Sequence, residues 1–157
     1  MIICGIDPGK TGAMVILYPD NALTVHDVPT VKMSGRDKPA WKQWDREWRQ
    51  ALDFAGVDLV VIENVAARPG QGVTSMFNFG RTLGFIHALA CASGGVIEMP
   101  TPSVWKGKMG LLNSSKGASR EKASTFFPRH ACHFGRVKDD GRAEAALLAL
   151  YGRKYLA

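Results

Sequence analysis

Four acidic side chains in this chain stand where they could bind a divalent metal ion. Asp7 follows a short apolar stretch near the N-terminus, and Glu63 directly follows a second one, Leu59 to Ile62. Asp140 and Glu144 are four residues apart and would share one face of a helix. Carboxylates gathered without cations repel one another, so such a cluster favours a metal site. Oxygen ligands favour Mg²⁺ or Mn²⁺ over Zn²⁺, and two such ions about 3.5–4 Å apart can activate water and stabilise the leaving oxygen of a phosphodiester.

Three of these acids also have an ordinary structural explanation. Asp7 precedes a Pro-Gly pair and could simply accept hydrogen bonds from the turn. Asp140 could cap a helix, and Glu144 could be a solvated residue paired with a neighbouring cation. The metal site is favoured by the order of the acids, which follow two apolar strands and then open the last helix. Whether Asp139 shares the role of Asp140 is left open.

The elements that would position these acids form an α/β pattern. Alternating and apolar stretches predict strands at Met1 to Ile6, Ala13 to Leu17, Leu23 to Val28, Leu59 to Ile62 and Val96 to Met99. Helical spacing predicts helices at Trp41 to Phe54, Val73 to Ala92, Val104 to Met109, Ser119 to Phe127 and Ala143 to Tyr151. Pro29 to Pro39 is expected to be a polar, turn-rich connection. We therefore expect one α/β domain, residues 1–157, with a mixed five-stranded sheet, antiparallel in its first three strands and then parallel, flanked by helices. Acids at the carboxyl ends of strands would meet at one edge.

Composition narrows the class of protein. The net charge of +6 favours a polyanionic partner, with nucleic acid ahead of an acidic membrane surface. No apolar run approaches the roughly 20 residues that span a bilayer, so we expect no membrane association. The three cysteines make an odd number, which argues against a secreted disulfide framework and favours a reducing cytoplasm. His130, Cys132 and His133 are too few and too closely spaced to predict a zinc site.

Four stretches of the sequence resemble the RuvC-like Holliday-junction resolvases of the ribonuclease H-like superfamily, particularly the shorter form found in phages and prophages. They are GIDPGKTGA around Asp7, VVIENVAARPGQGVTSMFNFGRTLGFIHA from Val60 to Ala88, PTPSVWKGKMGL from Pro100 to Leu111, and DDGRAEAALLALYG from Asp139 to Gly152. Together they cover nearly the whole chain. The resemblance implies a ribonuclease H-like fold and a metal-dependent endonuclease that cuts four-way DNA junctions as a homodimer, with forks and flaps as further candidate substrates.

The same resemblance implies roles for the four acids. Asp7, Glu63, Asp140 and Glu144 would be catalytic and would hold Mg²⁺ or Mn²⁺, two ions in each active site. The cellular members end with two aspartates three residues apart, whereas Asp140 and Glu144 are four apart and end in the longer acid. The metal preference of this chain is therefore open.

Basic residues suit a DNA substrate, because lysine and arginine neutralise phosphates and release counterions. By resemblance, Lys108 and Lys116 would lie near the scissile phosphate and stabilise charge in the transition state. Cellular relatives carry an aromatic wedge soon after their second acid, and this loop has none, so Phe77 or Phe79 is the candidate for opening the junction. The expected DNA contacts are Lys10, Arg68, Gln71, Lys106, Lys108, Lys116, Arg120 and Lys122.

The predicted helix from Val73 to Ala92 is apolar on more than one face, so it needs two partners. One sheet can cover only one face, and a junction has two equivalent strands to cut, so we expect a two-fold homodimer built on this helix. The alternative is a helix buried between the sheet and the C-terminal helix. The expected interface residues are Met76, Phe77, Phe79, Leu83 and Phe85.

Two other functions compete with the nuclease. One is a branched-DNA-binding protein without catalytic activity, which would bind a four-way junction without nicking it. The other, less favoured, is an actin-like or sugar-kinase-type ATPase, because the stretch from Asp7 to Gly12 fits the Asp-x-Gly-x-Thr-Gly turn of that class. Such ATPases enclose the nucleotide with a second domain, for which we expect 157 residues to leave no room.

Overall fold

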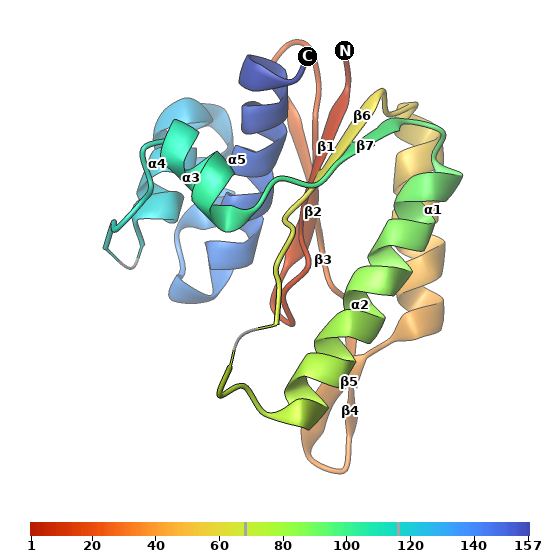
Figure 1. Cartoon of the computed structure of the whole chain (residues 1–157). Coiled ribbons are helices and arrows are strands. Elements are labelled where there is room, and N and C mark those ends of the chain that lie inside the picture. The colour runs from red at the N-terminus through yellow and green to blue at the C-terminus, as the bar shows by residue number, and fades with distance from the viewer. Residues whose placement is uncertain (68, 116) are drawn as a thin grey trace.

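The central element is a five-stranded mixed sheet with the strand order β3-β2-β1-β6-β7 (Figure 1). The computed structural model describes residues 1–67, 69–115 and 117–157. Strands β1 and β2, and β2 and β3, pair antiparallel, whereas β6 pairs parallel with both β1 and β7. The strands are β1 (Ile3–Asp7), β2 (Ala13–Leu17), β3 (Leu23–Asp27), β6 (Leu59–Ile62) and β7 (Val96–Glu98). The predicted mixed sheet is confirmed.

Helices cover both faces of this sheet, as the apolar character of its central strands requires. Two helices, α1 (Trp41–Ala55) and α2 (Val73–Ala92), lie on one face. The other face carries α3 (Pro102–Lys108), α4 (Ala118–Phe126), α5 (Asp140–Tyr155) and the 3₁₀ turns Pro128–Phe134 and Val137–Asp139 (Figure 1). None of the helices described is both long and apolar enough to cross a membrane.

Two tryptophans of α1 belong to the core. Trp44 and Trp48 are fully buried, and the ring of Trp41 stacks on that of Trp44 at 5.6 Å. The helix ends where Gly56 adopts a left-handed backbone conformation and its N–H bonds to the carbonyl of Leu52. The aromatic side of α1 therefore fixes the layer that covers β1 and β6.

Helix α5 lies unusually close to β1, because small residues meet at the contact. A Cβ atom on Gly5 would overlap the carbonyl oxygen of Ala145 and would stand 2.5 Å from the amide nitrogen of Ala149. A Cβ on Gly141 would overlap the carbonyl oxygen of Thr11 and would lie 3.0 Å from Oδ2 of Asp7. The first turn of α5 is thereby held directly against the end of β1.

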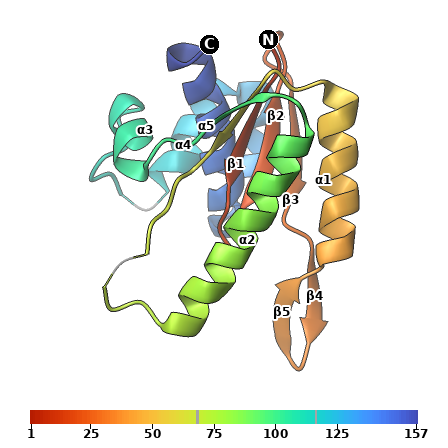
Figure 2. The ribbon, with the colours of Figure 1, turned by 45° about the vertical axis from the view of Figure 1, so that its right-hand side comes forward.

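The segment from Pro29 to Pro39 is a β-hairpin, and the prediction of an irregular connection was wrong. Strands β4 (Thr30–Met33) and β5 (Arg36–Pro39) pair antiparallel and form a separate two-stranded sheet. Both residues of the connecting turn, Ser34 and Gly35, have positive φ, as tight hairpins with matched twist require. Nearly all of the hairpin is exposed, so no apolar alternation marked its strands. Figures 1 and 2 show it extending beyond the main sheet, near the first half of α2.

Candidate active site

Two of the predicted acids stand side by side at one edge of the sheet. Asp7 is the last residue of β1, and Glu63 directly follows β6. Ile6 and Ile62 are partners in the parallel register, and the amide of Glu63 donates to the carbonyl of Ile6 at 3.1 Å. The carboxyl ends of the two strands therefore bring Asp7 and Glu63 together, as expected.

Asp7 lies in an environment that disfavours its charge. Burial raises its pKa to about 7, and the charges of Glu144 and Glu63 act in the same direction. The Gly9 amide, which donates to Oδ1 at 3.0 Å, and the charge of Lys106 lower it. Asp7 thus accepts a hydrogen bond from the turn through Oδ1. This bond does not offset the effects of burial and of the two neighbouring carboxylates, so the pKa of Asp7 stays raised.

Glu63 is 6% exposed and is held by a tryptophan that sequence analysis assigned only to a short helix. The indole Nε1 of Trp105 donates to Oε1 of Glu63 at 2.9 Å, and Trp105 itself is fully buried. Burial raises the pKa of Glu63, against the effects of this hydrogen bond and of nearby Lys106. Trp105 therefore fixes the orientation of the second acid from α3.

Lys106 lies between Glu63 and Glu144. Its Nζ lies 2.8 Å from Oε1 of Glu144 and 4.0 Å from Oε1 of Glu63. The hydroxyl of Ser119 also donates to Oε1 of Glu144, at 3.2 Å. Asp7, Glu63 and Glu144 thus form a carboxylate cluster with one lysine inside it. The contact from Ser119 had no signal in the sequence, because α4 is far from α5 along the chain.

Asp140 and Asp139 make different contacts. The side chain of Asp140 is 54% exposed and accepts from Nε of Arg120 at 2.7 Å. Asp139 is 1% exposed, accepts from the backbone and guanidinium of Arg136, and lies 3.5 Å from Nη1 of Arg142. Its hydrogen bonds with Arg136 lower the pKa of Asp139. Asp139 is thus held by two arginines, and Asp140 contacts α4.

As they stand, the described residues include no group of three or more His, Cys, Asp or Glu side chains arranged to hold a metal ion. The ammonium of Lys106 lies between Glu63 and Glu144 and neutralises part of their charge. The donor chemistry nevertheless suits a divalent ion, since all three side chains offer carboxylate oxygens and burial disfavours charge on two of them.

The other expected DNA contacts are distributed around this cluster. Lys10 is exposed in the turn after β1, and Gln71 is exposed in the loop before α2. Lys108 lies over the rings of Tyr151 and Tyr155, with Nζ 5.9 and 5.0 Å from their centroids. Lys106, rather than Lys108, is therefore the lysine of α3 at the acids. Lys122 is half-buried on α4, and two further predictions, Arg68 and Lys116, lie outside the described residues.

The five residues expected at a dimer interface do not share one surface of α2. Phe77 is 66% exposed, whereas Phe85 packs 5.2 Å from the rings of both Trp41 and Trp44. Leu83 also packs against the core, and Met76 and Phe79 are half-buried. The alternative of a helix between the sheet and α5 is wrong, because α2 and α5 lie on opposite faces of the sheet (Figure 1).

His130 has a structural contact. Its Nε2 accepts a hydrogen bond from the amide of Leu23 at 3.2 Å, and burial lowers its pKa. All three cysteines are unpaired, which agrees with the expectation that the chain has no disulfide framework.

No protein-family model matches this sequence, and no curated protein is a significant match. Solved structures do match over almost the entire chain. RuvC of Thermus thermophilus has a TM-score of 0.62 at 20% identity, with 99% of this chain and 95% of that chain covered. The fowlpox virus Holliday junction resolvase has a TM-score of 0.53 at 20% identity, covering 96% of each chain.

A third match is the yeast mitochondrial Holliday junction resolvase, with a TM-score of 0.53 at 14% identity, covering 95% of this chain and 76% of that chain. Thermus thermophilus RuvC has also been solved in complex with a Holliday junction substrate. This chain matches that structure with a TM-score of 0.62 at 17% identity, and the match covers 99% of this chain and 95% of that chain. The chain therefore has the ribonuclease H-like fold found in RuvC-type resolvases.

Proposed function

We propose that this chain, as one domain from residue 1 to 157, is a divalent-metal-dependent endonuclease that cuts four-way and other branched DNA. The observation that carries the proposal is the meeting of Asp7, Glu63 and Glu144 at one sheet edge. The fold it shares with the resolvases named above supports the same substrate class.

Asp7, Glu63 and Glu144 would hold Mg²⁺ or Mn²⁺, with Asp140 as a further ligand if it leaves Arg120. When bound, a pair of such ions lowers the pKa of water and stabilises the leaving oxygen of a phosphodiester. The chain's own residues prepare this chemistry. Trp105 orients Glu63, and the tight contact of α5 with β1 fixes where Glu144 stands.

Lys106 would exchange partners when the site is loaded. Its ammonium now neutralises Glu144, and it would leave that contact if Glu144 held a divalent ion instead. A lysine freed beside the acids is then within reach of a phosphate oxygen, where it would stabilise developing negative charge. The role that resemblance gave to Lys108 and Lys116 is thus proposed for Lys106 first.

Two active sites are needed to resolve a junction, and a two-fold homodimer would supply them. The exposed apolar residues at the start of α2, Val73 at 86% and Phe77 at 66%, support a contact there. The half-buried Met76 lies beside them on the same part of the helix. We therefore propose the side of α2 that carries Val73, Met76 and Phe77 as the interface, in place of the longer surface that included Phe79, Leu83 and Phe85.

A cleavage assay on a labelled four-way junction tests this function. The wild-type protein should nick the junction in Mg²⁺ or Mn²⁺ and not in EDTA. Asp7→Asn and Glu63→Gln should bind the junction in a gel-shift assay without cutting it, because the phosphate contacts remain when a metal ligand is lost. A wild-type protein that shifts the junction and never nicks it would be a binding protein, and the nuclease proposal would be discarded.

A further inference from the structure

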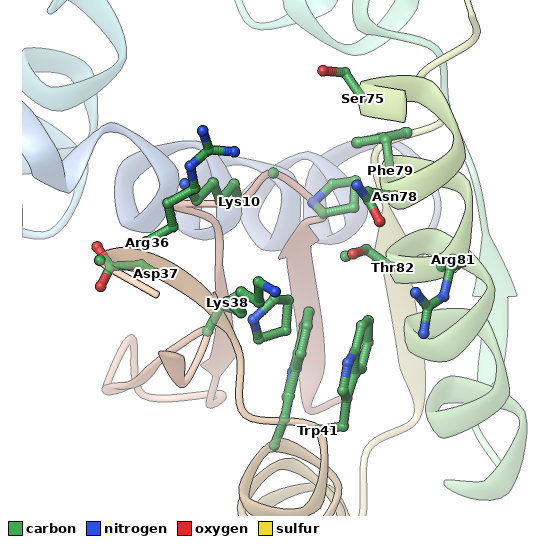
Figure 3. A pocket seen from close by; sticks show the side chains of 16 residues that line it. Lys10, Arg36, Asp37, Lys38, Trp41, Ser75, Asn78, Phe79, Arg81 and Thr82 are labelled. Atoms are coloured by element: carbon green, nitrogen blue, oxygen red, sulfur yellow. The ribbon is translucent and has the colours of Figure 1, made fainter. Parts of the chain in front are cut away.

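A groove of about 780 Å³ lies on the α1–α2 side of the sheet, opposite to the side of Lys106 and Glu144. The turn after β1, the β4–β5 hairpin, the start of α1 and the first half of α2 form it, together with Val28. The residues that matter below are Lys10, Arg36, Lys38, Trp41, Phe79 and Arg81 (Figure 3).

The groove is strongly basic. Lys10, Arg36, Lys38 and Arg81 are all exposed, and none of the four forms a salt bridge within the described parts of the chain. One acid, Asp37, also borders the groove, and in Figure 3 its carboxylate points away from the others. Cations that form no salt bridge and border one groove attract an anionic ligand, and four of them together suit a polyanion.

Aromatic rings stand among these cations. The guanidinium of Arg81 lies 5.6 Å from the ring centroid of Trp41, which orients it at the wall of the groove. Phe79 is half-buried and lies across the groove from Lys10 and Arg36 in Figure 3. A groove that combines cations with aromatic rings is typical of proteins that bind single-stranded nucleic acid, because phosphates meet the cations and bases stack on the rings.

The groove also reaches the turn that follows Asp7, the last residue of β1. Pro8, Gly9 and Lys10 line it, and they directly follow Asp7 in the chain. We infer that the groove binds an unpaired, single-stranded segment of DNA next to the cut, held by the β4–β5 hairpin and α2. This inference rests on the proposed function only in identifying that strand as part of the substrate.

Binding to a fluorescein-labelled oligothymidylate, measured by anisotropy between 0.05 and 0.5 M salt, tests the groove without any cleavage. The test variant is Arg36→Ala/Lys38→Ala. Each phosphate contact on a single strand contributes about 0.7 to the slope of log K against log salt, so losing two should lower the slope by about 1.4. If both proteins bind equally at 1 M salt, this corresponds to roughly 25-fold weaker binding at 0.1 M.

The matched control is Lys32→Ala/Lys42→Ala, which removes the same charge from the hairpin and α1 at exposed positions outside the groove. It should bind within about twofold of wild type. Circular dichroism and thermal unfolding of both variants show whether the hairpin change affects folding.

Tryptophan fluorescence gives a second readout that does not depend on the hairpin. Trp41 and Trp44 both line the groove, but Trp44 is fully buried, as are Trp48 and Trp105, whereas Trp41 is half-buried and can be reached by a ligand. Oligothymidylate should quench the wild-type emission, and Trp41→Phe should lose most of that quenching.

The outcomes separate the two proposals. Equal affinities and slopes for the test variant and the control would refute the proposal that the groove binds single-stranded DNA. A wild-type protein that binds duplex but not oligothymidylate would refute it too. A protein that binds oligothymidylate through Arg36 and Lys38 yet never cuts a junction would keep the groove and refute the nuclease.

Discussion

Replacing Asp7 with asparagine should make the metal-free protein more stable while it abolishes cleavage. Burial and two neighbouring carboxylates raise the pKa of Asp7 from its ordinary 3.8 to about 7. The folded state therefore holds this proton more tightly than the unfolded state. The resulting stability is fully present below about pH 4 and is lost as the pH rises through 7.

The size of the effect follows from the two pKa values. At 1.36 kcal/mol for each pH unit, the loss of this stability costs the folded state about 4 kcal/mol at pH 8, and about 2 kcal/mol at pH 5, where only the unfolded state has ionised. Asparagine avoids this cost, and its side-chain oxygen can still accept the hydrogen bond from the Gly9 amide. For a chain of this length, 4 kcal/mol corresponds to a rise in Tm of roughly 8–16 °C.

Thermal unfolding in EDTA at pH 5 and pH 8 measures this difference. Asp53→Asn on α1 is the control, because Asp53 is exposed and its replacement should change stability by less than about 0.5 kcal/mol. An Asp7→Asn protein no more stable than wild type at pH 8, or one whose advantage does not shrink at pH 5, would refute the account of the site as a strained carboxylate cluster.

Three further predictions concern the other parts of the site and the interface. Glu144→Gln should abolish junction cleavage. Asp139→Asn should retain cleavage at low temperature but have a lower Tm, because Asp139 is hydrogen-bonded and ion-paired to arginines. Equal losses of cleavage would show that Glu144 is no more important to the active site than Asp139. Lys106→Met should slow single-turnover cleavage about 10²- to 10³-fold, as expected for one lost donor to transition-state charge, and an unchanged rate would remove Lys106 from the mechanism. Phe77→Glu should give a monomer in light scattering that nicks one strand per encounter, and a mutant that remains dimeric and makes paired cuts at the wild-type rate would place the interface elsewhere.

The main features of the site could be predicted because they depend on strand ends. Apolar stretches that stop at Asp7 and Glu63 indicate two buried strands, and neighbouring parallel strands bring their last residues together. The four-residue spacing of Asp140 and Glu144 predicted one helix face, but it did not show that Arg120 would draw Asp140 aside. That contact comes from α4, so it depends on tertiary packing.

Most of the incorrect predictions also depend on tertiary packing, which the sequence pattern does not show. Lys106 and Lys108 lie two residues apart on a short helix and so face different ways, and only packing decides which one meets the acids. Phe77 and Phe85 are both apolar residues of α2, and the rings of α1 determine that Phe85 is the buried one. In the hairpin, the Ser34-Gly35 turn was the available signal, but exposed strands gave no apolar alternation to support it.

The close contact between α5 and β1 limits how this protein can evolve. Gly5 and Gly141 leave no room for even a methyl group, since a Cβ at either would overlap a backbone carbonyl oxygen. In a library of random variants, these two positions should accept almost no replacement, although neither carries a functional group. The position of Asp7 relative to Glu144 thus depends on two residues that have no side chain. A variant that replaces either glycine would lose the alignment of Asp7 with Glu144 while it still carries both acids.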